Sequence, residues 1–242
     1  MAAPSAIRQP PGKTWTVADL NRKFGPIPFE RIRQNPPPGR GTVADVERIN
    51  DQENRLYELV DGILVEKAMG FEESYIGGTI FELIRRYVKQ FVLGLVLPAD
   101  GTVQLDLKLV RIPDVSFISW DRLPGGEFPS KAIPRIVPDL AVEVISQSNT
   151  AREMNDKLRE YFAKGVRLVW FVRPRSRVVD VYTRPDQFTR LTASMTLDGG
   201  DVLPGFSVTV GELFALPKRP ADAGRGKKDE PRPGKPNGRR KR

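Results

Sequence analysis

Three ionisable side chains stand where they could carry chemistry. Asp114 follows Pro113 at the entry to an apolar segment, Glu143 lies inside the apolar segment 140–145, and Lys157 lies in a helical pattern further on. An unpaired carboxylate inside an apolar strand is costly, so Glu143 requires a cation or a metal ion as its partner. Two carboxylates and a lysine are groups that metal-dependent hydrolysis of a phosphodiester uses.

Each residue has a defined role in that chemistry. Asp114 and Glu143 would hold Mg²⁺ or Mn²⁺, which polarises the phosphate and lowers the pKa of a bound water, while Lys157 stabilises developing charge or positions the water. Each also has a purely structural interpretation: an Asp in a turn, a Glu in an ion pair, and a Lys reaching from a helix edge to solvent. Their occurrence together favours a site.

The composition excludes several other kinds of catalysis. The chain of 242 residues contains no Cys and no His. Thiol nucleophiles, disulfides, zinc fingers and imidazole general bases are therefore absent. The longest apolar run, 91–97, is too short for a membrane span, and the N-terminus lacks the features of a signal peptide, so we expect a cytoplasmic protein with no membrane contact.

The positive charge is concentrated at one end. The formal net charge is +9, and residues 218–242 carry eleven Lys or Arg against three Asp or Glu, leaving the remainder nearly neutral. That segment is rich in Pro and Gly and has no aromatic or branched aliphatic residue, which predicts a disordered tail over 217–242. A basic tail suits a polyanionic partner such as nucleic acid, or it serves only solubility.

The elements that would position these residues follow from apolar spacing. The strands predicted are 56–60, 63–65, 103–109, 115–118, 140–145, 167–172 and 178–182. The helices predicted are 16–23, 43–50, 76–91 and a segment that begins after Thr150 and ends at Gly165. Thr150 and Glu153 form a capping box, and Lys157 lies about 60° from Met154 at the border of the apolar stripe, so its ammonium could reach inward.

This order of elements predicts an α/β fold with a mixed central sheet flanked by helices. We expect residues 1–53 to form a Pro-rich N-terminal arm, 54–216 to form the main domain, and 217–242 to form the tail.

The sequence also resembles a known family. The segments that carry the resemblance are Tyr57-Glu58-Leu59-Val60-Asp61-Gly62, Pro113-Asp114-Val115-Ser116-Phe117, Pro138-Asp139 running to Glu143-Val144-Ile145-Ser146, Asp156-Lys157 with Tyr161, and Gly165-Val166 followed by Trp170. In this order they are similar to the Uma-two family of restriction endonuclease-like proteins, a branch of the PD-(D/E)XK nuclease superfamily. The match covers about residues 54–216.

The resemblance implies a restriction-endonuclease-like core with Asp114 and Glu143 as metal ligands. The usual lysine position of the superfamily falls on Ile145, so the lysine is expected from the following helix, as Lys157. Glu58 matches the opening motif and is either a further acidic ligand or a structural residue of the hairpin. A histidine that the family often carries near the start of its first long helix is missing, and Tyr75 lies nearest to that place.

Two functions of different classes follow. The first is a Mg²⁺-dependent endonuclease acting on DNA, for which a symmetric homodimer would supply two sites to cut both strands. The second is a catalytically inactive protein that keeps the nuclease fold and binds nucleic acid, with affinity dominated by the basic tail.

Overall fold

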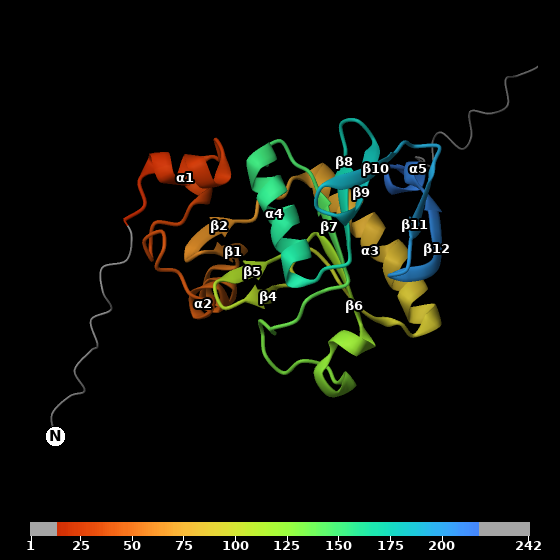
Figure 1. Ribbon diagram of the computed structural model, residues 1–242, viewed down its shortest axis with the longest axis horizontal. Helices are drawn as coiled ribbons and strands as arrows, with labels where there is room; N and C mark the ends of the chain where they lie inside the picture. The colour runs from red at the N-terminus through yellow and green to blue at the C-terminus, as the bar shows by residue number, and fades with distance from the viewer. Residues whose placement is uncertain (1–13, 218–242) are drawn as a thin grey trace, which may run out of the picture.

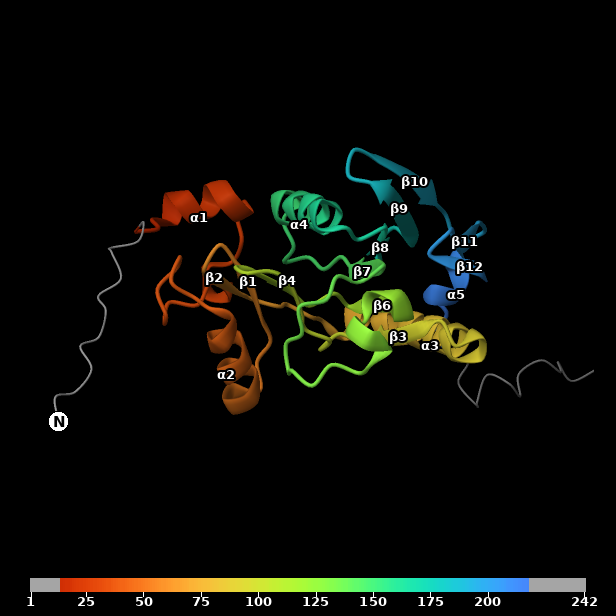
Figure 2. The ribbon, with the colours of Figure 1, turned by 60° about the horizontal axis from the view of Figure 1, so that its bottom comes forward.

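Residues 14–217 are described by the computed structural model, which contains two larger β-sheets beside each other (Figures 1 and 2). The predicted disordered tail, apart from Pro217, and the first thirteen residues of the predicted arm lie outside the described residues. Within the described residues, no helix is long and apolar enough to cross a membrane.

The larger sheet is mixed and has six strands. Across the sheet these are β10 (Gln187–Leu191), β9 (Val178–Arg184), β8 (Leu168–Arg173), β7 (Leu140–Val144), β6 (Val115–Ser119) and β3 (Gly94–Leu97). Only β7 and β8 pair in parallel, because the helix between them carries the chain back to the same edge of the sheet. The other neighbouring pairs are antiparallel.

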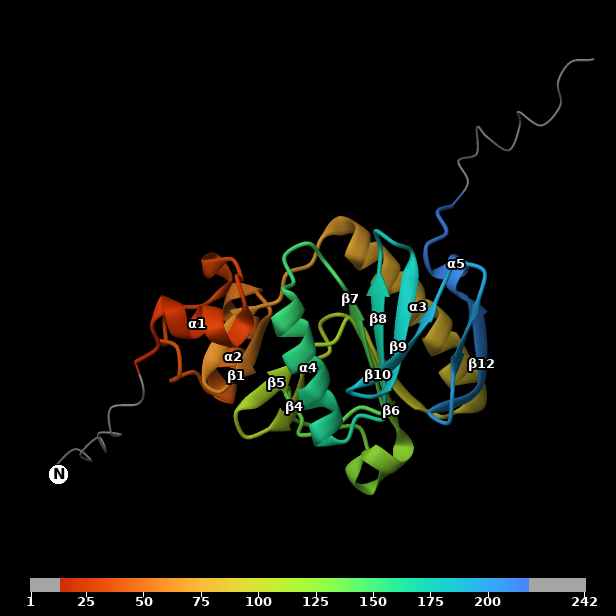
Figure 3. The same cartoon turned by 45° about the horizontal axis from the view of Figure 1, so that its top comes forward.

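Two helices cover opposite faces of this sheet (Figure 3). On β7, Val142 and Val144 belong to the apolar cluster that includes α3 (Phe71–Phe91), whereas Ala141 belongs to the cluster that includes α4 (Ala151–Lys164). Alternate residues of the strand therefore face different helices, as the period of two requires. Glu143 shares the α4 face with Ala141 for the same reason.

The smaller sheet has four antiparallel strands in the order β2 (Ile63–Glu66), β1 (Tyr57–Val60), β5 (Leu109–Arg111) and β4 (Val103–Asp106). Asp61 and Gly62 join β1 to β2 and both have positive φ, 51° and 79°. Positive φ at both central residues is the conformation that a two-residue hairpin favours, so the predicted hairpin is confirmed. Helix α2 (Val43–Glu53) packs on β1.

One predicted strand is wrong. The alternation of leucines over 103–109 predicted a single strand, but the structure has the hairpin β4–β5 in the smaller sheet. The turn falls at Leu107, whose side chain is 72% exposed, and the backbone N–H of Leu107 donates to the Asp106 carboxylate. A turn residue that happens to be apolar continued the alternating pattern across the break.

The N-terminal segment packs on the rest of the molecule. Helix α1 (Val17–Phe24) begins at Thr16 with a capping box and contacts α4, and its Leu20 and Phe24 are buried. Short 3-10 helices lie at Phe29–Arg31, Trp120–Arg122 and Pro124–Gly126. The boundary between arm and main domain at residue 53 stays a prediction.

The apolar spacing indicated no element after Tyr182, where the structure has several. These are β10, the pair β11 (Thr196–Gly199) and β12 (Leu203–Thr209), and the short helix α5 (Val210–Leu213). β12 and α5 both contact α3, and Phe206 and Leu213 are buried there. These elements near the end of the described residues therefore pack against α3.

Candidate active site

Asp114 lies at the edge of the larger sheet where β7 ends. Its backbone N–H donates to the Val142 carbonyl at 2.9 Å, which continues the antiparallel ladder of β6 and β7 by one residue. Its Oδ2 accepts a hydrogen bond of 2.6 Å from the backbone N–H of Val144. The carboxylate is thus fixed beside the strand that carries Glu143, and both residues are buried, with exposed fractions of 7% and 5%.

Glu143 meets two side chains of α4. Lys157 Nζ lies 3.1 Å from each oxygen of the Glu143 carboxylate, and Tyr161 Oη donates to Glu143 Oε1 at 2.5 Å. Lys157 and Tyr161 are four residues apart and therefore share one face of the helix. The helix presents that face because the Thr150–Glu153 capping box fixes its start, as predicted.

Glu58 of β1 joins the same cluster from the smaller sheet. Its Oε1 lies 3.0 Å from Lys157 Nζ and accepts a 3.0 Å hydrogen bond from the backbone N–H of Ile112. Its Oε2 accepts a 2.7 Å hydrogen bond from Arg111, which also pairs with Glu160 of α4. The structure therefore brings Glu58 and Glu143 into contact with Lys157, and Asp114 immediately precedes the neighbouring strand β6.

A second lysine, Lys67, pairs with Asp114 and was not predicted from the sequence. Its Nζ lies 2.9 Å from Asp114 Oδ1 and donates to the backbone carbonyls of Ile112 at 2.6 Å and Ala99 at 3.1 Å. Its side chain is only 6% exposed. The available signal was a lone lysine directly after an apolar strand, but nothing in its sequence neighbourhood names Asp114 as the partner. Arg111 was missed for the same reason.

The charges of the cluster shift the pKa values of Glu143 and Glu58 in opposite directions. Burial, together with the carboxylates of Asp114 and Glu58, raises the pKa of Glu143, although Lys157 acts in the opposite direction. Burial alone would also raise the pKa of Glu58, but the charges of Lys157 and Arg111 lower it to about 2. The ionised form is therefore less favoured for Glu143 than for Glu58 in the folded protein.

Lys157 and Tyr161 keep their protons. Burial opposes the charge of Lys157, but the carboxylates of Glu143 and Glu58 outweigh it and raise its pKa above the ordinary value. Burial and the same two carboxylates raise the pKa of Tyr161 well above the ordinary value. At neutral pH Lys157 is thus a fixed cation and Tyr161 a hydrogen-bond donor, and neither is a general base.

The oxygen atoms present are of the kind that Mg²⁺ binds. Within residues 14–217, no group of three or more acidic side chains is arranged to hold a metal ion. Mg²⁺, however, commonly takes one or two carboxylates and completes its coordination with water and substrate phosphate. Both oxygens of Asp114 and Oε2 of Glu143 accept a single hydrogen bond each, which leaves a lone pair on each. Asp114 and Glu143 therefore fit such an ion.

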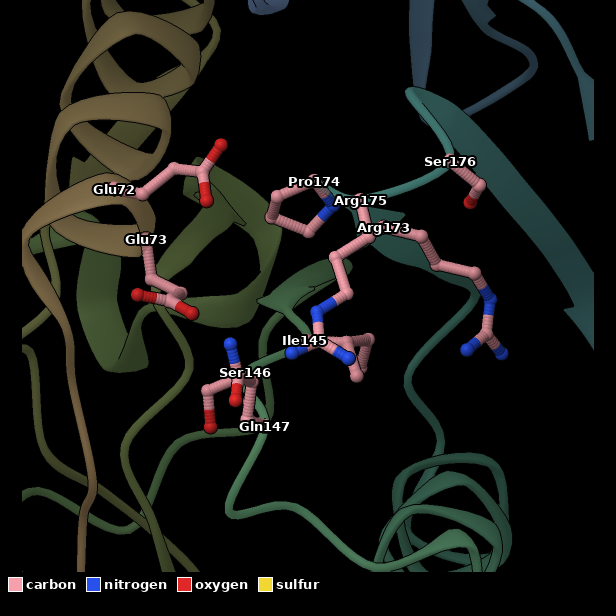
Figure 4. A pocket seen from close by; sticks show the side chains of 9 residues that line it. All are labelled: Glu72, Glu73, Ile145, Ser146, Gln147, Arg173, Pro174, Arg175 and Ser176. Carbon is pink, nitrogen blue, oxygen red and sulfur yellow. The ribbon is translucent and has the colours of Figure 1, made fainter.

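A pocket opens beside this cluster at the ends of β7 and β8. Its lining comes from three segments: the first turn of α3, the residues that follow β7, and the turn between β8 and β9 (Figure 4). Ile145 and Ser146 of its wall follow Glu143 closely along the chain. Tyr75 does not lie in this wall, because its hydroxyl donates to the Ala215 carbonyl at 3.0 Å on the other side of α3.

Comparison with known proteins supplies the family. The Uma2 family model, described as "Putative restriction endonuclease", matches residues 43–211. The fold is similar to a crystal structure described as that of "a putative nuclease belonging to DUF820" from Anabaena variabilis, with a TM-score of 0.62 and 20% sequence identity over 72% of this chain and 97% of that chain. No curated protein is similar enough to match.

At 20% identity the structural likeness shows the fold alone, and it confirms the predicted restriction-endonuclease-like α/β class. The family match spans well over half of the 242 residues and includes all four predicted site residues. The chain therefore belongs to the Uma2 family, whose description is "Putative restriction endonuclease".

Proposed function

We propose that this protein is a Mg²⁺- or Mn²⁺-dependent endonuclease that hydrolyses DNA phosphodiester bonds. The observation that supports it best is the buried cluster in which Asp114, directly before β6, is hydrogen-bonded to the strand that carries Glu143, with Lys157 in contact with Glu143. Asp114 and Glu143 would hold the metal ion. When bound, that ion would supply Lewis-acid polarisation of the phosphate.

The side chains around the two carboxylates have separate tasks in this proposal. Lys157 supplies a permanent positive charge that stabilises negative charge developing on the phosphate. Tyr161 orients Glu143 through its hydrogen bond to Oε1, and Glu58 with Arg111 fixes the position of Lys157. Lys67 holds Asp114 from the opposite side.

The test is cleavage of supercoiled plasmid DNA with Mg²⁺ or Mn²⁺, which EDTA should prevent. Asp114→Asn keeps the size of the side chain and should reduce cleavage at least about 100-fold, since it removes one of two charged ligands. Asp51→Asn, at an exposed position of α2, is the matched control and should cleave as the wild type does. Cleavage that survives Asp114→Asn, or that never occurs with either metal, contradicts the proposal.

One observation favours a second function, an inactive nucleic-acid-binding protein. Lys67, Lys157 and Arg111 already pair with Asp114, Glu143 and Glu58, so the carboxylates are neutralised without a metal ion. Metal binding separates the two functions independently of cleavage. If Mg²⁺ raises the melting temperature of the wild type but not that of Asp114→Asn, the result supports the endonuclease. If the protein binds DNA and Mg²⁺ does not change its melting temperature, the result supports the inactive protein.

We further propose the division into arm (1–53), nuclease domain (54–216) and basic tail (217–242), with DNA as the partner of both domain and tail. A homodimer would place two such sites on one DNA duplex.

A further inference from the structure

The pocket beside the cluster contains a positive charge that no other described residue neutralises. The pocket has a volume of about 190 Å³. It is lined by Glu72, Glu73, Ile145, Ser146, Gln147, Arg173, Pro174, Arg175 and Ser176. Figure 4 shows the two glutamates on α3 facing the turn that follows β8, with Ser146 and Gln147 below them in this view.

Arg175 differs from the other arginines of its turn. Arg173 donates to Asp180 at 2.7 Å, and Arg177 donates to the Phe214 carbonyl at 3.2 Å and stacks on the Phe214 ring. Arg175 is exposed and has no hydrogen bond or ion pair to any residue between 14 and 217. Its guanidinium is therefore available to a ligand, and the neighbouring Ser176 adds a hydroxyl group to the same wall.

The pocket lies close to the carboxylates of the candidate active site. A Cβ atom placed on Gly77 of α3 would lie 3.9 Å from Asp114 Cβ, so this point of the helix touches Asp114. Glu73 is one helical turn before Gly77, a rise of about 6 Å along the axis. On the other wall, Ile145 is two residues beyond Glu143. A strand that passes Asp114 and Glu143 would therefore reach the pocket next.

The distribution of charge in the pocket determines where an anion can bind. Glu72 and Glu73 repel a phosphate from the α3 side, whereas Arg175 attracts it to the opposite wall. Arginine binds phosphate through two parallel N–H groups, and serine hydroxyls and backbone N–H groups are its usual companions. A phosphate is thus restricted to the side that carries Arg175 and Ser176.

We propose that this pocket binds a backbone phosphate of the nucleic-acid strand, adjacent to the phosphodiester that faces Asp114 and Glu143, and that Arg175 is the residue that holds it. This inference rests on the proposed function for its ligand. It assigns to Arg175 a positioning task that neither the sequence motifs nor the cluster around Lys157 supplies.

The experiment measures binding of a labelled 24-base-pair duplex by fluorescence anisotropy at several salt concentrations, in EDTA and in an Asp114→Asn background. Arg175→Gln should weaken binding roughly tenfold, since it removes one charge-assisted contact. It should also lower the slope of log K against log salt by about 0.9, the value for one phosphate. Arg85→Gln, at an exposed site of α3 near the far end of the helix, is the matched control and should change neither quantity.

Because Arg175 has no partner among the described residues, its substitution should leave the melting temperature unchanged, and the binding data then report contact with DNA alone. Equal affinities and slopes for Arg175→Gln and Arg85→Gln would overturn the inference. The inference would also be overturned if Arg175→Gln lost binding of inorganic phosphate but kept the DNA affinity of the wild type.

The outcome is separable from that of the proposed function. If Arg175→Gln weakens DNA binding but the wild type never cleaves DNA, the phosphate site stands and the endonuclease proposal fails. If the wild type cleaves DNA and Arg175→Gln binds DNA as tightly as the wild type does, the endonuclease proposal stands and the phosphate site fails.

Discussion

Glu143 is the residue at which stability and the proposed activity are in conflict. It is buried, and the charges of Asp114 and Glu58 add to the cost of ionising it, which Lys157 and Tyr161 only partly offset. A cation placed beside it would relieve that cost. Buried charge of this kind is typical of sites where a ligand, and not the fold, provides the missing partner.

Replacing Glu143 with Gln should therefore stabilise the protein at pH 8 while abolishing cleavage. Because the pKa of Glu143 is raised in the folded state, its contribution to stability is full below its unfolded pKa near 4.5 and is lost as the pH rises through the folded pKa. The Glu143→Gln variant cannot ionise at this position, so it keeps this stability as the pH rises. We expect its free energy of unfolding to exceed that of the wild type by about 1 kcal/mol at pH 8 and by little at pH 4. Urea denaturation at the two pH values measures the difference.

Glu53→Gln is the control for this experiment, because Glu53 is exposed and its pKa is lowered by Arg33. It should gain no stability at pH 8. A Glu143→Gln protein that is less stable than the wild type at both pH values would show that the ion pair with Lys157 outweighs burial.

Lys67 competes with a metal ion for Asp114. Lys67→Met removes the ammonium that lies 2.9 Å from Asp114 Oδ1 but keeps the apolar stem of the side chain. Loss of one partner from a buried pair costs about 3 kcal/mol, so the metal-free variant should melt at a lower temperature. Mg²⁺ should then raise its melting temperature by more than that of the wild type, because Asp114 is no longer neutralised.

Thermal denaturation with and without 10 mM Mg²⁺ gives the comparison. Lys23→Met removes an exposed ion pair with Asp61 and should show neither the loss nor the larger metal response. An equal metal response in Lys67→Met and the wild type would exclude Asp114 as a ligand.

At the scale of elements, α4 is the part that assembles the cluster. Lys157 and Tyr161 project from one face of it onto Glu143, and its N-terminus is held from outside by Arg31, which pairs with Glu153 at 2.8 Å. Arg31 also donates to the Ser148 carbonyl at 3.1 Å, in the segment that joins β7 to α4. The N-terminal segment therefore fixes both the start of the helix and the segment before it.

Arg31→Met should destabilise the protein by about 3 kcal/mol, because Glu153 would remain buried without its partner. Cleavage of DNA should fall as well, since α4 would lose the contact that fixes its start. Limited proteolysis should cut the variant within residues 14–42 faster than the wild type. Arg33→Met, which breaks the more exposed pair with Glu53, is the control; equal proteolysis of the two variants would contradict the role given to Arg31.

The elements that could be predicted from sequence were those with a local signal. The Asp61–Gly62 turn and the capping box of α4 are local, and both are confirmed. The prediction of one strand over 103–109 was wrong because the spacing of the leucines does not show that Leu107 is exposed in a turn. That exposure depends on how the flanking strands pair in the smaller sheet.

The same distinction applies to the site. Asp114, Glu143, Lys157 and Glu58 were found because they occupy unusual local positions or match family motifs, and their catalytic roles stay predictions. Lys67 and Arg111 were missed because their significance depends on contacts between residues far apart in sequence, such as the 2.7 Å hydrogen bond from Arg111 to Glu58. A buried ion-pair network is a property of the folded chain, so its members have no distinguishing pattern beforehand.

At the scale of the whole molecule, the basic charge and the candidate active site belong to different parts of the chain. Eleven of the 39 Lys and Arg residues lie in 218–242, which contains only three acidic residues. The cluster of Asp114, Glu143 and Lys157, in contrast, contains paired charges. We therefore expect binding strength and cleavage chemistry to be separable by truncation.

Removal of residues 218–242 should weaken DNA binding at 50 mM salt by at least about tenfold and reduce its salt dependence, since each lost phosphate contact lowers the slope by about 0.9. The rate of cleavage at saturating DNA should be unchanged, because the metal ligands and Lys157 are retained. A full-length variant with the tail lysines and arginines replaced by Gln is the control that separates charge from length. If the truncated protein binds DNA as tightly as the full chain, the folded surface, including the pocket with Arg175, must carry the affinity instead.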